Sequence, residues 1–146
     1  MLTPERYDMK ICIPGKPQGK ARPRFTRAGR AYTPSSTREY ENLIRLQASR
    51  CMASSAPIEG PVSVTIVAHF APPSSYSKKR REACLSGCEK PAKKPDLDNV
   101  VKAVLDGMNG IIFRDDSQVV QITASKTYGA SEQVSVYIAE EGKADD

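Results

Sequence analysis

The stretch KPDLDNVVKAVLDGMNG, residues 94–110, carries the clearest structural signal in the sequence and much of its chemistry. Beyond Asp98 its apolar residues recur at helical spacing and form one face: Val100, Val101, Val104, Leu105 and Met108. Asn109-Gly110 then ends the pattern, as expected at a helix C-terminus. Two aspartates, Asp96 and Asp98, precede the apolar face. The stretch therefore predicts an amphipathic helix with carboxylates at its N-terminus.

The segments around this helix predict an α+β fold. Strands are expected over 10–15, 62–70, 117–129 and 133–139, the last two joined as a hairpin around Gly129-Ala130. Helices are expected over 36–52, opened by a Ser36–Glu39 capping box, and over 77–87, and residues 16–34 form a loop or ragged hairpin. Strands and helices mix without strict alternation. We expect one domain over residues 1–146, with a small mixed β-sheet, packed helices and a frayed tail at 140–146.

Composition is that of a soluble globular protein, with 39% hydrophobic and 27% charged residues. No apolar run approaches the roughly 18 residues of a membrane span, and the first residues lack a signal-peptide core, so a cytoplasmic location is expected.

Cys12 and Cys51 fit buried positions. Cys84 and Cys88 are four apart, but a zinc site needs two further ligands, and His69, the single histidine, fits a strand position.

Charge is distributed unevenly along the chain. Residues 1–95 hold 18 Lys and Arg against 7 Asp and Glu, whereas residues 96–146 hold 4 against 10, and the two halves sum to the net charge of +5. A strongly basic half indicates a polyanionic partner. Acids in the other half would repel that partner, so they call for a separate explanation such as a bound cation.

The acidic residues have the chemistry of a metal site. Asp96 and Asp98 are two apart, so their side chains point the same way if the chain before the helix is extended, and Asp115 or Asp116 can supply a third carboxylate. Carboxylates gathered in this way repel one another unless a cation lies among them. Mg²⁺ prefers oxygen ligands and is commonly shared with substrate phosphates. Lys102, one turn beyond Asp98, would contact the phosphate.

A purely structural reading explains the same residues. Asp98 would cap a helix, Lys102 and Asp106 would form a solvated pair, and Asp115-Asp116 would form a turn. An EF-hand does not fit, because counting from Asp96 the sixth residue is Val101 rather than Gly.

The basic residues gather mainly in KPQGKARPRF, residues 16–25. Arginine binds phosphate in bidentate fashion, and a Gly/Pro-rich loop can follow a curved backbone. We expect four residues to contact DNA: Lys16, Lys20, Arg22 and Arg24. Phe25 and Tyr32 are expected to be buried, with stacking on bases as the alternative. Lys78-Lys79-Arg80-Arg81 forms a second basic patch.

Nearly the whole chain resembles the RusA family of Holliday junction resolvases, many of them carried by phages and prophages. The resemblance rests on IPGKPQGKARPRF, AYTPSSTREYENLI, KPDLDNVVKAVLDGMNG, FRDDSQV and the Lys126–Gly129 motif. It implies a homodimeric endodeoxyribonuclease that uses Mg²⁺, with Mn²⁺ as a substitute, to make paired nicks in four-way DNA junctions during recombination and repair. Its metal-binding catalytic carboxylates map onto Asp96, Asp98 and Asp116, with Asp115 as the adjacent alternative, and its lysine maps onto Lys102.

The leading hypothesis is therefore a metal-dependent junction resolvase whose acidic side chains meet at one point in each subunit. No organic cofactor and no membrane partner are implied. The alternatives are a non-catalytic protein that binds branched DNA, which would bind in a salt-sensitive way without a Mg²⁺-dependent product, and a related nuclease acting on flaps, loops or RNA.

Overall fold

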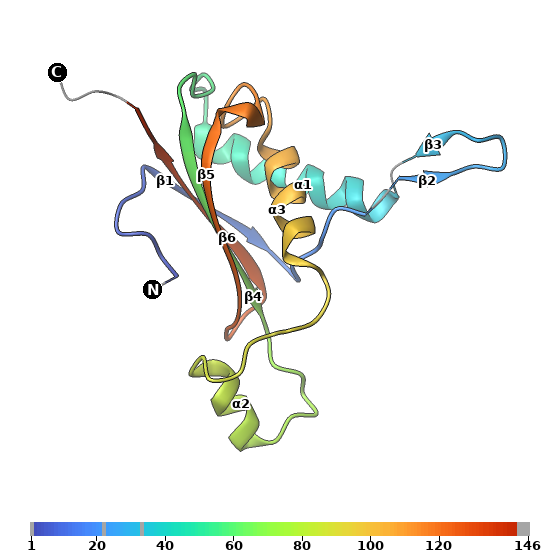
Figure 1. The fold of residues 1–146 in the computed structure, drawn as a ribbon, viewed down its shortest axis with the longest axis vertical. Helices are drawn as coiled ribbons and strands as arrows, with labels where there is room; N and C mark the ends of the chain where they lie inside the picture. Colours follow the sequence, from blue (N-terminus) through green and yellow to red (C-terminus); the bar gives the residue numbers. More distant parts are fainter. Residues whose placement is uncertain (1, 22, 33, 143–146) are drawn as a thin grey trace.

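The computed structural model describes residues 2–21, 23–32 and 34–142 (Figure 1). Its elements follow in the order β1 Met9–Pro14, β2 Arg24–Phe25, β3 Ala31–Tyr32, α1 Ser35–Met52, β4 Val62–Phe70, α2 Lys78–Leu85, α3 Leu97–Met108, a 3₁₀ turn η1 Asp116–Gln118, β5 Val119–Tyr128 and β6 Gln133–Glu140. The main sheet has the strand order β1-β6-β4-β5. β4 pairs with β6 in antiparallel fashion and with β5 in parallel fashion. The expected α+β fold with a mixed sheet is confirmed.

The predicted hairpin between the last two strands is wrong. β5 and β6 are joined by residues 129–132, but β4 lies between them and pairs with both. The cause is burial. β4 is apolar enough to be buried over most of its length, including Val67 on the face away from the helices. β5 begins with exposed residues such as Gln121 and Thr123, which suit an edge strand.

The core lies between the sheet and the helices α1 and α3, which pack against each other on one face of the sheet (Figure 1). Their contact is close because α3 carries Gly107 where a larger residue would collide with α1. A Cβ added to Gly107 would lie 2.5 Å from Cγ2 of Ile44. The apolar face predicted for α3 is confirmed, since Val100, Val104 and Met108 are fully buried.

Several local expectations need correction. α1 begins at Ser35 with no side-chain capping bond, so the capping box is absent, and the Thr37 hydroxyl accepts a hydrogen bond from the Ala21 N–H instead. The tail is ordered through residue 142: Glu140 ends β6, and Glu141 N–H donates to Pro61 O. Residues 143–146 lie outside the described part of the chain.

Exposure also differs from expectation at four positions. Cys12 and Cys51 are exposed rather than buried. Phe25 and Tyr32 are exposed as well, because they belong to the two-stranded β2–β3 hairpin, which projects away from the sheet and the helices (Figure 1). Within the described residues, no helix is both long enough and apolar enough to cross a membrane.

Candidate metal centre and nucleic-acid interface

The loop before α3 holds the first predicted carboxylate in an exposed position. Asp96 is the N-cap residue of α3 and has extended backbone angles, as the sequence predicts. Its Oδ1 lies 2.9 Å from the Nζ of Lys94, across a cis Lys94–Pro95 peptide. A cation therefore already faces this carboxylate in the protein itself.

Lys126, a residue of the sheet, forms hydrogen bonds with the loop that precedes α3. It lies near the end of β5, and its Nζ donates hydrogen bonds to Lys93 O and, at 2.9 Å, to Pro95 O. Sequence reasoning assigned no role to this lysine, although the Lys126–Gly129 motif marked its position. The contacts make Lys126 a positioning residue for the segment that leads into Asp96.

The basic amino-terminal loop packs directly on the first turn of α3. Lys20 N–H donates to Asn99 O over 2.9 Å. A Cβ added to Gly19 would lie 2.8 Å from Cβ of Asn99 and 3.2 Å from Cβ of Pro95, so only glycine fits this approach. Segments about eighty residues apart in sequence are thus brought together, and the basic loop lies beside the start of the acidic helix.

An ion-pair network continues along α3. Lys20 Nζ lies 2.5 Å from Glu41 Oε1 and 2.9 Å from Asp106 Oδ2. Partial burial lowers the pKa of Lys20, but the hydrogen bonds and charges of Glu41 and Asp106 outweigh it, so the pKa is raised. Lys20 thereby ties the basic loop to both helices.

Lys102 and Asp98 remain accessible on the same helix. Lys102 Nζ is 3.7 Å from Asp106 Oδ1, a loose contact for a largely exposed side chain. Asp98 lies in the first turn of α3, where the helix dipole favours its charge. Its carboxylate has no hydrogen bond or ion pair within the described residues.

The two adjacent aspartates before β5 have different roles. Asp115 caps η1: its Oδ2 accepts from Ser117 N–H at 3.1 Å, while the Gln118 side chain accepts from Asp115 N–H. Hydrogen bonds from the Ser117 hydroxyl and backbone hold the pKa of Asp115 below its ordinary value. For Asp116, by contrast, the described residues provide no hydrogen bond or ion pair, so its carboxylate is available to a ligand.

The expected meeting of three carboxylates within one chain is not found. Asp96 and Asp98 lie at the start of α3, near the end of β5, whereas Asp116 follows the other end of α3 (Figure 1). From Asp98 to Met108 the helix alone rises about 15 Å. Across the described residues, no group of three or more His, Cys, Asp or Glu side chains is placed to hold a metal ion. Sequence spacing missed this because it does not show at which end of the sheet each loop lies.

The residues predicted to contact DNA are spread over the basic loop and hairpin. Lys16 and Arg24 are exposed, Lys20 is held in the ion-pair network, and Arg22 lies outside the described residues. In the second basic patch Arg80 stacks on Tyr76, 3.6 Å from the ring centroid. Arg80 also pairs with Glu89, so part of this patch is engaged within the protein.

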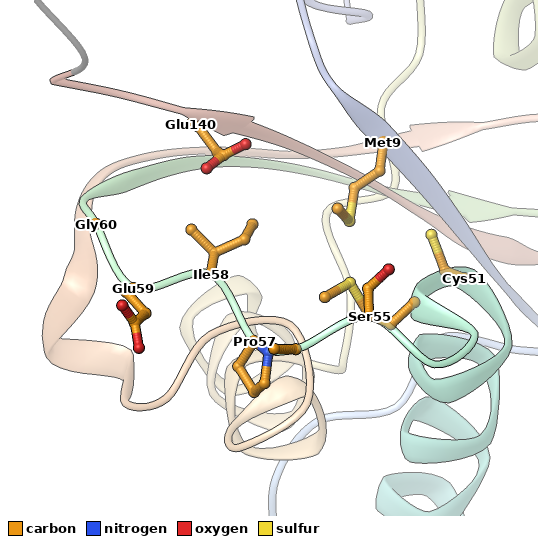
Figure 2. Close-up of a pocket in the computed structure, with 10 residues that line it drawn as sticks. Met9, Cys51, Ser55, Pro57, Ile58, Glu59, Gly60 and Glu140 are labelled. Atoms are coloured by element: carbon orange, nitrogen blue, oxygen red, sulfur yellow. The ribbon is translucent and has the colours of Figure 1, made fainter.

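A pocket of about 500 Å³ lies elsewhere, at the end of α1 (Figure 2). It is lined by Met9, Cys51, Met52, Ser55, Ala56, Pro57, Ile58, Glu59, Gly60 and Glu140. The lining includes two carboxylates and no lysine or arginine, which does not suit a polyanion. It also includes none of the residues predicted for the metal site.

Comparison with known proteins identifies the class. A family model described as Endodeoxyribonuclease RusA matches residues 14–139, so the chain belongs to the RusA endodeoxyribonuclease family. The match covers the basic loop, both long helices, β4, β5 and all of β6 except its last residue, whereas of β1 it includes only Pro14. Membership makes this chain a nuclease of that class, in a family that acts on DNA junctions.

A curated relative is similar along almost its full length. The chain is 36% identical over 137 residues to "Uncharacterized protein YqaN" of Bacillus subtilis (strain 168). The match covers 90% of this chain and 96% of the relative. The two chains thus correspond as whole domains.

Proposed function

We propose that this protein is a Holliday junction resolvase, a homodimeric, metal-dependent endonuclease that makes paired nicks in four-way DNA junctions. The observation that carries the proposal is the contact between the basic loop and the acidic helix start, in a chain of the RusA family. A phosphate backbone held by the loop would lie next to Asp96 and Asp98. A non-catalytic DNA-binding role gives no reason to keep the unpaired carboxylate of Asp98 at that position.

Asp96, Asp98 and Asp116 are the proposed Mg²⁺ ligands on the chemistry of their carboxylates, although the three do not meet within the described part of one chain. Asp98 and Asp116 have free carboxylates within the described residues, and Asp96 is paired only with an exposed lysine. The choice of Asp116 over Asp115 is supported by the capping bonds that occupy Asp115. When bound, the metal would stabilise charge at the scissile phosphate and lower the pKa of an attacking water.

The remaining roles follow from exposure. Lys102 is accessible and loosely paired, so its ammonium can turn from Asp106 to a phosphate oxygen. Lys16 and Arg24, which are exposed, would hold the DNA backbone, and Arg22, which lies outside the described residues, is proposed for the same role on its sequence alone. Lys20 would act mainly by fixing the loop on α3. Phe25 and Tyr32 are exposed on the projecting hairpin, and we propose that they stack on unpaired bases at a branch point.

The test uses purified protein with three labelled substrates, a four-way junction, a linear duplex and a flap, each with and without Mg²⁺. We expect symmetric nicks in the junction alone, and only with the metal. Asp98→Asn should abolish cleavage while leaving junction binding intact, since the substitution removes a metal ligand and a charge that repels DNA. Glu39→Gln, at an exposed carboxylate on α1, is the matched control and should cut normally.

Two results would overturn parts of the proposal. Normal cutting by the Asp98→Asn variant in Mg²⁺ would remove Asp98 from the metal site. Equal cutting of all three substrates would leave a metal-dependent nuclease but refute its specificity for junctions.

A further inference from the structure

The segment between β4 and α3 carries a positive charge that the proposed catalytic residues do not explain. Residues 71–95 hold seven Lys and Arg against two Glu, and their net charge of +5 equals that of the whole chain. α2 belongs to this segment and stands apart from the sheet and the long helices, and the chain after it leads back to α3 (Figure 1). So much charge of one sign on one projecting part of the protein favours contact with a polyanion.

A pocket of about 250 Å³ lies where this segment meets the end of β5. Unlike the pocket at the end of α1, it is rich in cations and tyrosines, and its lining includes Tyr76, Arg80, Glu89, Lys90, Lys93 and Tyr128. The carboxylate in this lining is already neutralised, because Arg80 Nε lies 3.0 Å from Glu89 Oε1. The hydrogen bond from Arg80 holds the pKa of Glu89 below its ordinary value, so the two charges remain and cancel.

The uncancelled charge of the pocket belongs to Lys90 and Lys93. Both residues are exposed, and within the described part of the chain neither ammonium group pairs with a carboxylate. Lys93 Nζ instead lies 5.7 Å from the centre of the Tyr128 ring and 5.9 Å from that of Phe70. Aromatic faces attract an ammonium group without neutralising it, so Lys93 is positioned while its charge stays available.

The tyrosines add walls that do not repel an anion. Arg80 stacks on the Tyr76 ring and so fixes one wall in place. Burial and a hydrogen bond with Tyr76 raise the pKa of Tyr128 to about 12, so its phenol stays protonated. Two available ammonium groups beside neutral phenols suit a phosphate, whose oxygens accept charge-assisted hydrogen bonds.

We propose that this pocket binds one backbone phosphate of a DNA arm through the ammonium groups of Lys90 and Lys93. A single phosphate suits the volume, which is below the roughly 300–1,000 Å³ of pockets that enclose whole small molecules. The position of the pocket favours a phosphate inside a strand. Lys93 precedes Asp96 by three residues, and Lys126 holds the same loop through Lys93 O and Pro95 O. This step rests on the proposed function, because a strand that reaches Asp96 for cleavage would pass the pocket.

The first experiment measures binding of a fluorescent four-way junction in EDTA, so that no strand is cut, over a series of salt concentrations. Loss of one phosphate contact lowers the slope of log K against log salt by about 0.9. We expect this loss, with weaker binding, in the double variant Lys90→Gln/Lys93→Gln. Lys78→Gln/Lys79→Gln removes the same charge from exposed residues of α2 outside the pocket lining, and this matched control should keep the wild-type slope.

The second experiment locates the phosphate on the DNA. Single methylphosphonate linkages, which carry no charge, replace one phosphate at a time along the junction strands. In the wild type one linkage position should weaken binding, and in Lys90→Gln/Lys93→Gln the same position should have no effect, since its cationic partners are gone. Strands with and without a 5′-terminal phosphate should bind equally.

Three results would refute the phosphate site. These are an equal loss of slope in both double variants, a methylphosphonate effect that persists without Lys90 and Lys93, and a requirement for a terminal phosphate. The proposed function can fail separately. A protein that binds DNA through the pocket and never cuts a junction would refute the resolvase and leave the site standing, whereas normal cutting with an unchanged slope in the pocket variant would refute only the site.

Discussion

Gly19→Ala probes the contact that joins the basic loop to the acidic helix. A methyl group at this position would lie 2.8 Å from Cβ of Asn99 and 3.2 Å from Cβ of Pro95. Both atoms are attached to the backbone and cannot rotate away, so the loop or the start of α3 must shift. Overpacking of this kind costs about 1–3 kcal/mol of unfolding free energy. A shift near 1 Å at a catalytic carboxylate can lower the rate by about 10²-fold.

The assay combines urea unfolding with single-turnover cleavage of a four-way junction. Gly60→Ala is the matched control, since a Cβ there meets no atom within 4 Å and the backbone is not in the left-handed region. We expect the Gly19 variant to remain folded with a reduced midpoint and a much reduced cleavage rate. If it matches Gly60→Ala in both measurements, the contact does not position the carboxylates and the argument for a joined site is wrong.

Two further predictions concern a positioning residue and a buried phenol. Lys126→Met removes both hydrogen bonds to the loop before Asp96 while keeping the stem, so junction cleavage should show a lower kcat with little change in KM, whereas Lys10→Met on the opposite edge should leave both unchanged. Burial raises the pKa of Tyr40 to about 12, against an ordinary value of 10.0. Because the unfolded chain releases this proton first, the free energy of unfolding should fall as pH rises above about 10, by up to roughly 2–3 kcal/mol. Tyr40→Phe should flatten that alkaline decline in urea titrations, and an unchanged slope would contradict the burial argument.

Elements with a strong local pattern could be predicted from sequence. The alternation of β4 and the apolar face of α3 gave both elements nearly to the residue, because burial on one face imposes the period. Strand partners are a different matter. Whether β5 pairs with β6 or with β4 depends on which strand can be buried on both faces, and that is a property of the whole sheet.

Some features of the candidate site could likewise be predicted from local sequence, and others depend on the whole fold. Exposure of Asp98 and its place in the first turn of α3 follow from local sequence, as does the exposed hairpin of basic residues. The separation of Asp116 from Asp98 does not, since it depends on β5 running back along α3 to the loop that Lys126 holds. Phe25 and Tyr32 were expected to be buried because aromatic side chains usually lie in the core. They are exposed because, among the described residues, the two-stranded hairpin has no helix or second sheet packed against it.

The close crossing of α1 and α3 at Gly107 has a mechanical consequence. The β2–β3 hairpin precedes α1, and the loop that holds Asp96 precedes α3. Because the two helices pack closely where Gly107 contacts Ile44, the hairpin and the Asp96 loop are attached to one rigid helix pair. Lys20 fastens the same pair a second time through Glu41 and Asp106. If a bound branched duplex bends the hairpin, α1 and α3 would therefore move together as one rigid unit. The carboxylates at the start of α3 would then shift with the hairpin.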